Sequence, residues 1–170
     1  RPKVRNCAST AVMTIGIGGQ PGTLTTALSL TRSLTETAPV GFGLAPGMHG
    51  ANATGRPFTG DFAGVLLYQT LYDCGFASAA ESHHAGDGLE LIDCRITNAV
   101  KCLPPQNKPV GAEINACNDF LAQELESLGE GAVIVALGGI AHRAVVRAQG
   151  LRQKDFGFGH AREHCLPGTR

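Results

Sequence analysis

The sequence predicts an α/β protein, a three-layer αβα architecture in which a short, mainly parallel central sheet lies between two layers of helices. A continuous apolar run at residues 132–137 is followed by two glycines and by a helical pattern at residues 140–149. Strand, glycine turn and helix in this order are typical of a parallel sheet with helices on its faces. The chain has 170 residues, 43% of them hydrophobic, which is enough for one buried core.

Residues 1–39 carry the weakest secondary-structure signal, and we expect an irregular segment there, followed by one domain at residues 40–170. Within the segment, Gly16-Ile-Gly-Gly-Gln-Pro-Gly-Thr23 precedes a helical pattern at residues 24–34, as a phosphate-binding loop would. The loop lacks the Lys of a P-loop and the glycine spacing of a dinucleotide fingerprint. A flexible linker and a small nucleotide-binding α/β protein both stay open as interpretations.

The other elements follow from hydrophobic periodicity. Residues 63–74 repeat apolar side chains at helical spacing and end at Gly75, which predicts a helix with a left-handed C-terminal residue. Residues 89–100 alternate apolar and polar side chains and predict a strand. Residues 112–128 place their apolar side chains on one face and predict an amphipathic helix.

Two segments dense in turn-forming residues lie at about residues 43–61 and 97–107. Ligands of parallel sheets bind beyond the carboxyl ends of the strands. We therefore expect both segments at the same edge of the sheet, facing one crevice.

The charge composition argues against a protein that holds nucleic acid by bulk charge, because 14 basic residues balance 14 acidic ones. The charges are unevenly placed: residues 73–93 carry five acidic and no basic side chains, while residues 140–170 carry six basic and two acidic ones. A basic face and two merely solvated surfaces are both compatible with this pattern. Since no long apolar run or signal peptide is present, we expect a cytoplasmic protein. We also expect a monomer.

Four motifs, taken in order, resemble the uracil-DNA glycosylase superfamily. They are Gly43-Leu-Ala-Pro-Gly-Met-His-Gly50 with Thr54-Gly-Arg-Pro-Phe-Thr-Gly-Asp61, then Ile96-Thr-Asn-Ala-Val-Lys-Cys102 with Pro104-Pro-Gln-Asn107, then Val133-Ile-Val-Ala-Leu-Gly138, and finally Phe158-Gly-His-Ala161. The chain is most similar to the family-five (type B) enzymes, with family four second, over about residues 41–167. The resemblance implies a base-excision repair hydrolase that flips uracil, and other deaminated bases, out of DNA and cuts the N-glycosidic bond.

The resemblance also implies the site residues. Phe58 would stack on the flipped base, Asn98 would read its Watson–Crick edge, and Asp61 would orient water or stabilise the sugar cation. The loop around the first motif would contact the base through Gly43, Ala45, Gly47 and His49. By residue type alone, a core aromatic at Phe58, a strand-end amide at Asn98, a helix N-cap at Asp61 and an exposed His49 stay open.

Arg56 and Lys101 are the predicted DNA phosphate contacts, with ordinary surface charges as the alternative for both. Phosphate contacts strengthen binding without selecting a sequence.

Six cysteines in a chain without a signal peptide indicate reduced thiols or a metal site. Cys102 and Cys117 resemble the second half of the ligand set for the family's 4Fe–4S cluster, but the first half, a close pair, is missing, since Cys7 has no near partner. We favour a natural chain that begins further upstream. A chain without a cluster, or a thiolate site of Cys7, Cys94, Cys102 and Cys117, stays open.

The family also places a histidine loop near its carboxyl end, and the chain ends at Arg170 before such a loop. His160 and His164 precede that position and are not assigned its role. We therefore expect a truncated or frame-shifted glycosylase, and a catalytically incomplete remnant that binds DNA or a nucleobase without turnover is an alternative to an active enzyme.

Overall fold

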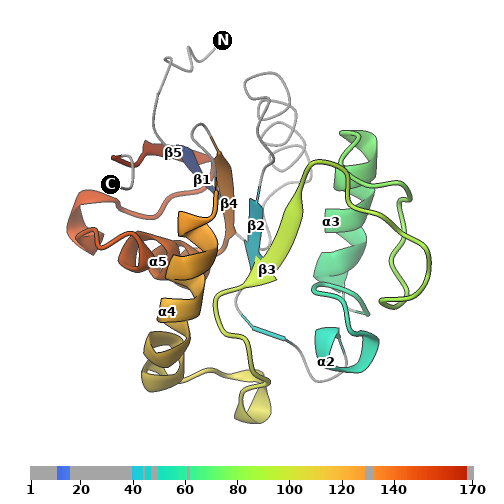
Figure 1. Ribbon diagram of the computed structural model, residues 1–170, viewed down its shortest axis with the longest axis horizontal. Helices are drawn as coiled ribbons and strands as arrows, with labels where there is room; N and C mark the ends of the chain where they lie inside the picture. The colour runs from blue at the N-terminus through green and yellow to red at the C-terminus, as the bar shows by residue number, and fades with distance from the viewer. Residues whose placement is uncertain are drawn as a thin grey trace.

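The computed structural model describes residues 11–15, 40–43, 45–46, 50–60, 62–128 and 132–167 (Figure 1). In chain order its elements are β1 (Ala11–Ile15), β2 (Val40–Gly43), α2 (Ala51–Thr54), α3 (Phe62–Asp73), β3 (Arg95–Asn98), η1 (Pro105–Asn107), α4 (Gly111–Glu126), β4 (Val133–Leu137), α5 (Gly139–Ala148), η2 (Gln153–Asp155) and β5 (Arg162–Cys165). The α/β class expected from the sequence is confirmed.

The strands form one sheet in the order β3-β2-β4-β1-β5. The pairs β3–β2, β2–β4 and β4–β1 are parallel, and β5 is antiparallel to β1 at one edge. Strand β4 lies at the centre, and all five of its residues are buried. This explains why its sequence is apolar throughout, since a parallel strand covered on both faces needs no polar side.

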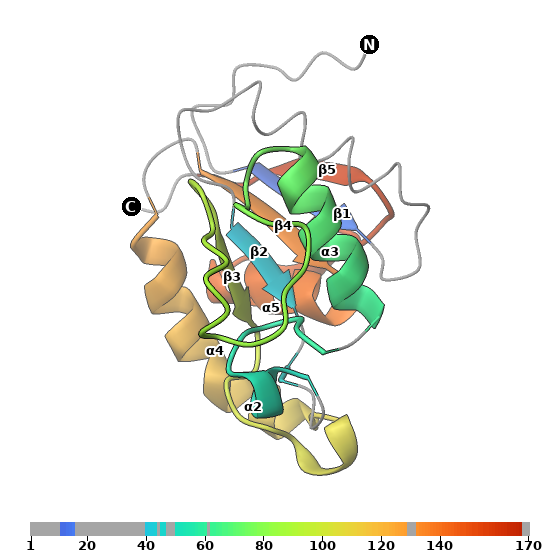
Figure 2. The ribbon, with the colours of Figure 1, turned by 90° about the vertical axis from the view of Figure 1, so that its right-hand side faces the viewer.

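Helices cover both faces of the sheet, and successive β4 side chains pack to opposite sides (Figure 2). Val133, Val135 and Leu137 pack with side chains of α3, while Ile134 and Ala136 pack with side chains of α4 and α5. The period of two along a strand thus divides the apolar side chains between two core clusters.

The three long helices confirm the predicted elements to within one or two residues at each end. Helix α3 buries Leu67, Tyr68 and Leu71 and is followed by Gly75 at φ 77°, the left-handed residue that the sequence predicts. Helix α4 begins where the Glu113 carboxylate accepts a hydrogen bond of 2.9 Å from the Val110 N–H, which satisfies one free donor of the first turn.

Two sequence predictions need correction. Residues 1–39 are not irregular throughout, because β1 lies inside the sheet and pairs in parallel with β4 at all five positions. The strand expected at residues 89–100 is confined to Arg95–Asn98, because Asp93 adopts a left-handed φ of 49° that breaks the extended backbone. The nucleotide loop expected at residues 16–23 and the helix expected at residues 24–34 lie outside the described residues.

Within the described part of the chain, no helix is both long and apolar enough to cross a lipid bilayer.

Candidate functional site

The loops that follow β2 and β3 lie at the same end of the sheet, together with α2 (Figures 1 and 2). Strands β2 and β3 are parallel neighbours, and their last residues, Gly43 and Asn98, are register partners. Because parallel strands end at the same edge, the segments that follow them are brought together, as the sequence predicts.

A cavity of about 370 Å³ lies at this edge. Its volume falls in the range of about 300–1,000 Å³ that is usual for small-molecule sites. Its lining comes from both motif loops, and the described residues in it are Pro46, Ala51, Asn52, Gly55, Pro57, Ile96, Thr97, Asn98, Lys101 and Leu103. Segments about 45 residues apart in the sequence therefore build one cavity wall.

Asn98 is the buried polar side chain of this cavity, with only 7% of the residue exposed. Buried amides are usually paired by hydrogen bonds, and a ligand in the cavity can supply such partners. An amide can donate from its NH2 group and accept at its oxygen. Asn98 is thus positioned to bind a polar ligand in the cavity.

Lys101 also lines the cavity, but its ammonium already has two partners. The Nζ atom donates to Thr97 Oγ1 at 2.6 Å and to Glu124 Oε1 of α4 at 2.8 Å. The second oxygen of Glu124 is buried and has no hydrogen-bond partner among the described residues. The pair ties the loop after β3 to α4, and a phosphate contact by Lys101 stays a prediction.

The structure gives Phe58 a different position from the flat pocket wall that the sequence predicts. Phe58 is half-buried and packs against the core cluster on the α3 side of the sheet. Its neighbours Gly55 and Pro57 line the cavity, and Phe58 is not among the lining residues. The core-aromatic alternative therefore describes the packing of Phe58 in this structure, and a stacking role stays a prediction.

Arg56, the other predicted phosphate contact, is bound within the protein. Its guanidinium lies 2.8 Å from Asp87 Oδ1, and only 12% of the Arg56 side chain is exposed. A guanidinium held in this way is not available as a surface charge. This arrangement favours a structural role over the phosphate contact.

Several predicted site residues cannot be compared with the structure. Gly47, His49 and Asp61 lie outside the described residues. Gly43 ends β2, and Ala45 is half-buried in the loop that follows. The lining residues that sequence reasoning missed are Pro46, Ala51, Asn52, Gly55, Pro57, Ile96, Thr97 and Leu103. The signal that could have identified them is their position in the sequence, since they lie inside or between the family motifs.

The described cysteines do not gather into a metal site. Cys102 is exposed after β3, and Cys117 is buried in α4. No group of three or more His, Cys, Asp or Glu side chains that could hold a metal ion occurs in the described ranges, and Cys7 lies outside them. Two thiolates do not complete a four-cysteine set, so the donors present do not fit a 4Fe–4S cluster.

A separate aromatic cluster lies between α5 and the chain that follows it. His142 is 1% exposed, and its Nε2 atom lies 2.7 Å from the Phe156 carbonyl oxygen. Its ring is 5.4 Å from that of His164 and 5.8 Å from that of Phe158. Burial lowers the pKa of His164, which favours its neutral form beside His142. None of these side chains lines the cavity.

Comparison with known proteins points to one family. The family model described as the uracil DNA glycosylase superfamily matches residues 36–167. A type-5 uracil-DNA glycosylase from Thermus thermophilus is 48% identical over 129 residues, which cover 76% of this chain and 58% of the relative. A type-5 uracil-DNA glycosylase from Pyrobaculum aerophilum is 43% identical over 117 residues, covering 69% of this chain and 51% of the relative.

A type-4 uracil-DNA glycosylase from Archaeoglobus fulgidus is 38% identical over 100 residues, covering 58% of this chain and 42% of the relative. The order of similarity, type 5 before type 4, is the order expected from the motifs. The chain spans about half the length of the curated relatives that it matches.

Proposed function

The chain belongs to the uracil-DNA glycosylase superfamily, and from this membership we propose that it hydrolyses the N-glycosidic bond of uracil in DNA. In this reaction the bond between the base nitrogen and C1′ of the sugar breaks, and its electron pair leaves with the base. The oxygen of a water molecule then forms the new bond to C1′, and the proton that this water loses balances the negative charge of the departed base. The proposed place in metabolism is base-excision repair.

The observation that carries the proposal is the position of Asn98, a buried amide residue that lines the cavity at the edge where both family motifs meet. A base inside a duplex must leave the stack before its glycosidic bond can be reached, which costs a few kcal/mol. A site that binds the base edge by hydrogen bonds recovers part of this cost. Asn98 offers a donor and an acceptor to the Watson–Crick edge of uracil.

The remaining roles are proposed from the sequence motifs. Asp61 supplies the carboxylate that orients water or stabilises the positive charge on the sugar. Backbone groups of the loop that contains Ala45 and Gly47 contact the base, and His49 lies in the same loop. Phe58 stacks on the base only if its ring turns from the core toward the cavity, and Pro57 and Ile96 are among the apolar lining residues already in place.

Binding to DNA in this proposal depends on the cavity more than on bulk charge, because the formal net charge of the chain is zero. Lys101 is the proposed phosphate contact, since it lines the cavity. Arg56 is no longer proposed as a phosphate contact, because its guanidinium donors are bound to Asp87 and to the loop around Asp87.

A 4Fe–4S cluster is implied by the resemblance, and Cys102 and Cys117 are the described cysteines that match two of its ligands. No step of the proposed reaction depends on it. Iron and sulfide content of the purified chain tests the ligand proposal, with Cys102→Ser compared to Cys74→Ser, which alters a buried cysteine outside the family pattern.

The function is tested by uracil release from an oligonucleotide that carries one uracil, compared with the same strand carrying cytosine or thymine. We expect release from the uracil strand only. Asn98→Ala should lower kcat/KM by about 100-fold, the usual cost of removing one buried catalytic hydrogen-bonding group. Asn115→Ala is the matched control, because Asn115 is an exposed α4 amide outside the cavity.

Absence of release by the parent chain contradicts the enzymatic proposal. Salt-sensitive binding of the uracil strand without release then identifies the non-catalytic binding alternative. Equal loss of activity in the Asn98 and Asn115 variants contradicts the assigned role of Asn98.

A further inference from the structure

The loop that borders the cavity has an unfavourable backbone conformation. Phe58 has φ 55°, in the left-handed region that a bulky residue rarely adopts. Such a conformation is strained and persists only where the surroundings hold it. Because Gly55 and Pro57 line the cavity on the same loop, whatever holds Phe58 also shapes the cavity wall.

Arg56, two residues before Phe58, is fixed by the segment 78–90, which follows α3. Its Nη1 atom lies 2.8 Å from Asp87 Oδ1 and 2.9 Å from Oδ2, and it donates to Ser82 Oγ at 2.8 Å. Its Nη2 atom donates to the carbonyl oxygens of Ala85 and Leu89 at 3.3 and 3.2 Å. One guanidinium thus binds four residues of that segment.

Asp87 is held as firmly on its other side. Its Oδ2 atom accepts hydrogen bonds from the backbone N–H of His83 at 2.7 Å and of His84 at 3.2 Å, and its Oδ1 atom accepts from Leu89 N–H at 3.0 Å. The Asp87 side chain is 8% exposed. These backbone donors, together with Arg56, lower the pKa of Asp87 well below its ordinary value, so the carboxylate stays ionised.

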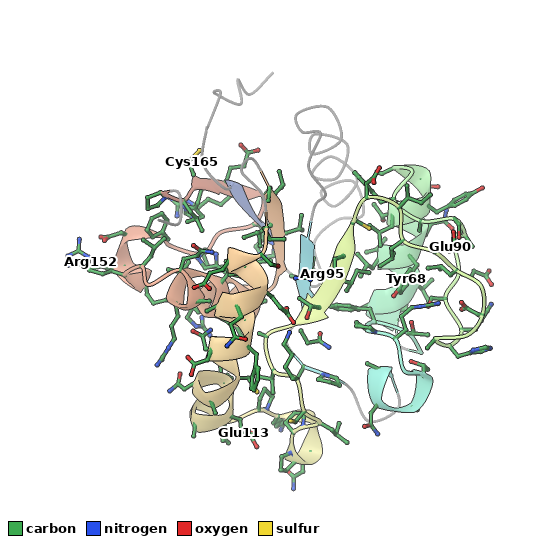
Figure 3. The ribbon with its side chains drawn as sticks, viewed as in Figure 1. Tyr68, Glu90, Arg95, Glu113, Arg152 and Cys165 are labelled. Carbon is green, nitrogen blue, oxygen red and sulfur yellow. The ribbon has the colours of Figure 1, made fainter. Side chains whose placement is uncertain are left out.

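Two further contacts hold the loop after Arg56. The hydroxyl of Tyr68, a fully buried α3 side chain, donates to the Pro57 carbonyl oxygen at 2.8 Å. Thr59, 1% exposed, has its hydroxyl 2.6 Å from that of Ser82. Figure 3 shows Tyr68 on α3, with Glu90 of the segment 78–90 beside this helix and far from Cys165.

A backbone hydrogen bond also connects segment 78–90 to the loop that borders the cavity. Ala85 N–H donates to the Thr54 carbonyl oxygen at 2.8 Å, next to Gly55, whose own N–H caps the end of α2 by donating to the Ala51 carbonyl oxygen at 2.9 Å. A Cβ atom at Gly55 would lie 3.1 Å from the Ala85 side chain, so the segments are in close contact at the cavity wall. Displacement of segment 78–90 must therefore move residues that line the cavity.

We propose that Asp87 is a positioning residue of the glycosylase site, which acts through Arg56 to hold residues 55–59 in the conformation that shapes the base-binding cavity. This inference rests on the proposed function. Asp87 lies 11 positions before Asn98, outside both family motifs, and it does not line the cavity. Its effect on turnover is indirect, through the loop.

The test compares Asp87→Asn and Tyr68→Phe with the parent, using the uracil-containing oligonucleotide at a temperature where circular dichroism shows every protein folded. Asp155→Asn is the matched control, because it makes the same chemical change in an exposed ion pair with Arg152, remote from the cavity. Both test variants should lower kcat between about tenfold and a hundredfold, the scale expected for a small misplacement of reacting groups. The control should keep the parent's kcat.

Amide hydrogen exchange gives a second readout that does not require activity. In Asp87→Asn, exchange at Gly55 and Ala85 should be faster than in the parent, while the central strand β4 keeps its protection. A purely structural role would lower the unfolding temperature and leave kcat of the folded enzyme unchanged, which would overturn the proposal.

The outcomes separate the two proposals. If the parent releases uracil and both test variants keep its kcat, the positioning role of Asp87 is wrong while the function stands. If the parent releases no uracil, the function fails, and the exchange rates at Gly55 and Ala85 still decide whether Asp87 holds the cavity wall: unchanged rates overturn it, faster rates support it.

Discussion

Gly43 and Asn98 are register partners at the last positions of two neighbouring parallel strands, β2 and β3. Each residue is followed directly by a loop that contains a family motif. The pairing therefore fixes where both loops begin, whatever path each loop then takes. The cavity at this edge is a consequence of strand register, which explains how two motifs that are distant in the sequence meet in one site.

Lys101 should contribute to DNA binding without regard to the base. Lys101→Met should weaken binding of a uracil strand and of a thymine strand by similar factors, because a phosphate contact carries no base information. The slope of log K against log salt should decrease by about 0.7 to 0.9, the value for one released counterion. Fluorescence anisotropy across a salt series measures both quantities.

Lys154→Met is the control for this change, since Lys154 lies in η2 and does not line the cavity. An unchanged salt slope in Lys101→Met would show that its ammonium serves only Glu124 and Thr97. In that case the prediction that Lys101 contacts a DNA phosphate is wrong.

Gly55→Ala should destabilise the protein more than Gly150→Ala. Both glycines have left-handed φ values, 75° and 67°, and alanine in this region costs about 1–2 kcal/mol in free energy of unfolding. At Gly55 the new methyl group would also lie 3.1 Å from the Ala85 side chain, whereas no atom lies within 4 Å at Gly150. Denaturant unfolding at equilibrium measures the difference.

Activity distinguishes the two glycine variants further. Gly55 lines the cavity, so Gly55→Ala should also reduce uracil release by folded protein, while Gly150→Ala should not. Equal unfolding free energies for the two variants would mean that the contact with Ala85 relaxes without cost.

The sequence was sufficient to predict those elements whose signal is local. The apolar run of β4 and the helical periods of α3, α4 and α5 each lie within a short window, and all four elements are found where expected. The meeting of the two motif loops followed from one rule about parallel sheets. These predictions did not require knowledge of long-range contacts.

Elements that depend on distant partners were not predictable in the same way. Residues 11–15 become β1 because they pair with β4, more than 100 residues later in the chain. Arg56 carries a charge that suits phosphate equally well, and only the folded chain brings it to Asp87, 31 residues away. Phe58 packs against the core and has a left-handed backbone, and no local pattern indicated that conformation.

Asp87 should make stability depend on pH in the acidic range. Its pKa in the folded chain is lowered well below 3.8, chiefly by the backbone N–H groups of His83 and Leu89, with a further contribution from Arg56. A lowered pKa contributes stability that is fully present above the unfolded value and is lost as pH falls through the folded value. The parent should therefore lose this contribution as pH falls below 3.8.

Asp87→Asn has no carboxyl group at this position and cannot show that loss. The difference in unfolding temperature between parent and variant should be constant above about pH 5 and should narrow at lower pH. Differential scanning calorimetry from neutral to acidic pH measures it. A difference that grows on acidification would contradict the assignment.

Cys94 should be far less reactive than Cys102 toward iodoacetamide at pH 8. Burial raises the pKa of Cys94 to about 11, and its thiol donates to the Phe76 carbonyl oxygen at 3.3 Å. Roughly one molecule in a thousand then carries the reactive thiolate at Cys94. Cys102 is exposed and should be modified first, as measured by mass spectrometry of peptides at successive times. Urea should make the two modification rates similar, because unfolding removes the burial that protects Cys94. Equal modification rates at Cys94 and Cys102 in the folded chain would contradict the prediction.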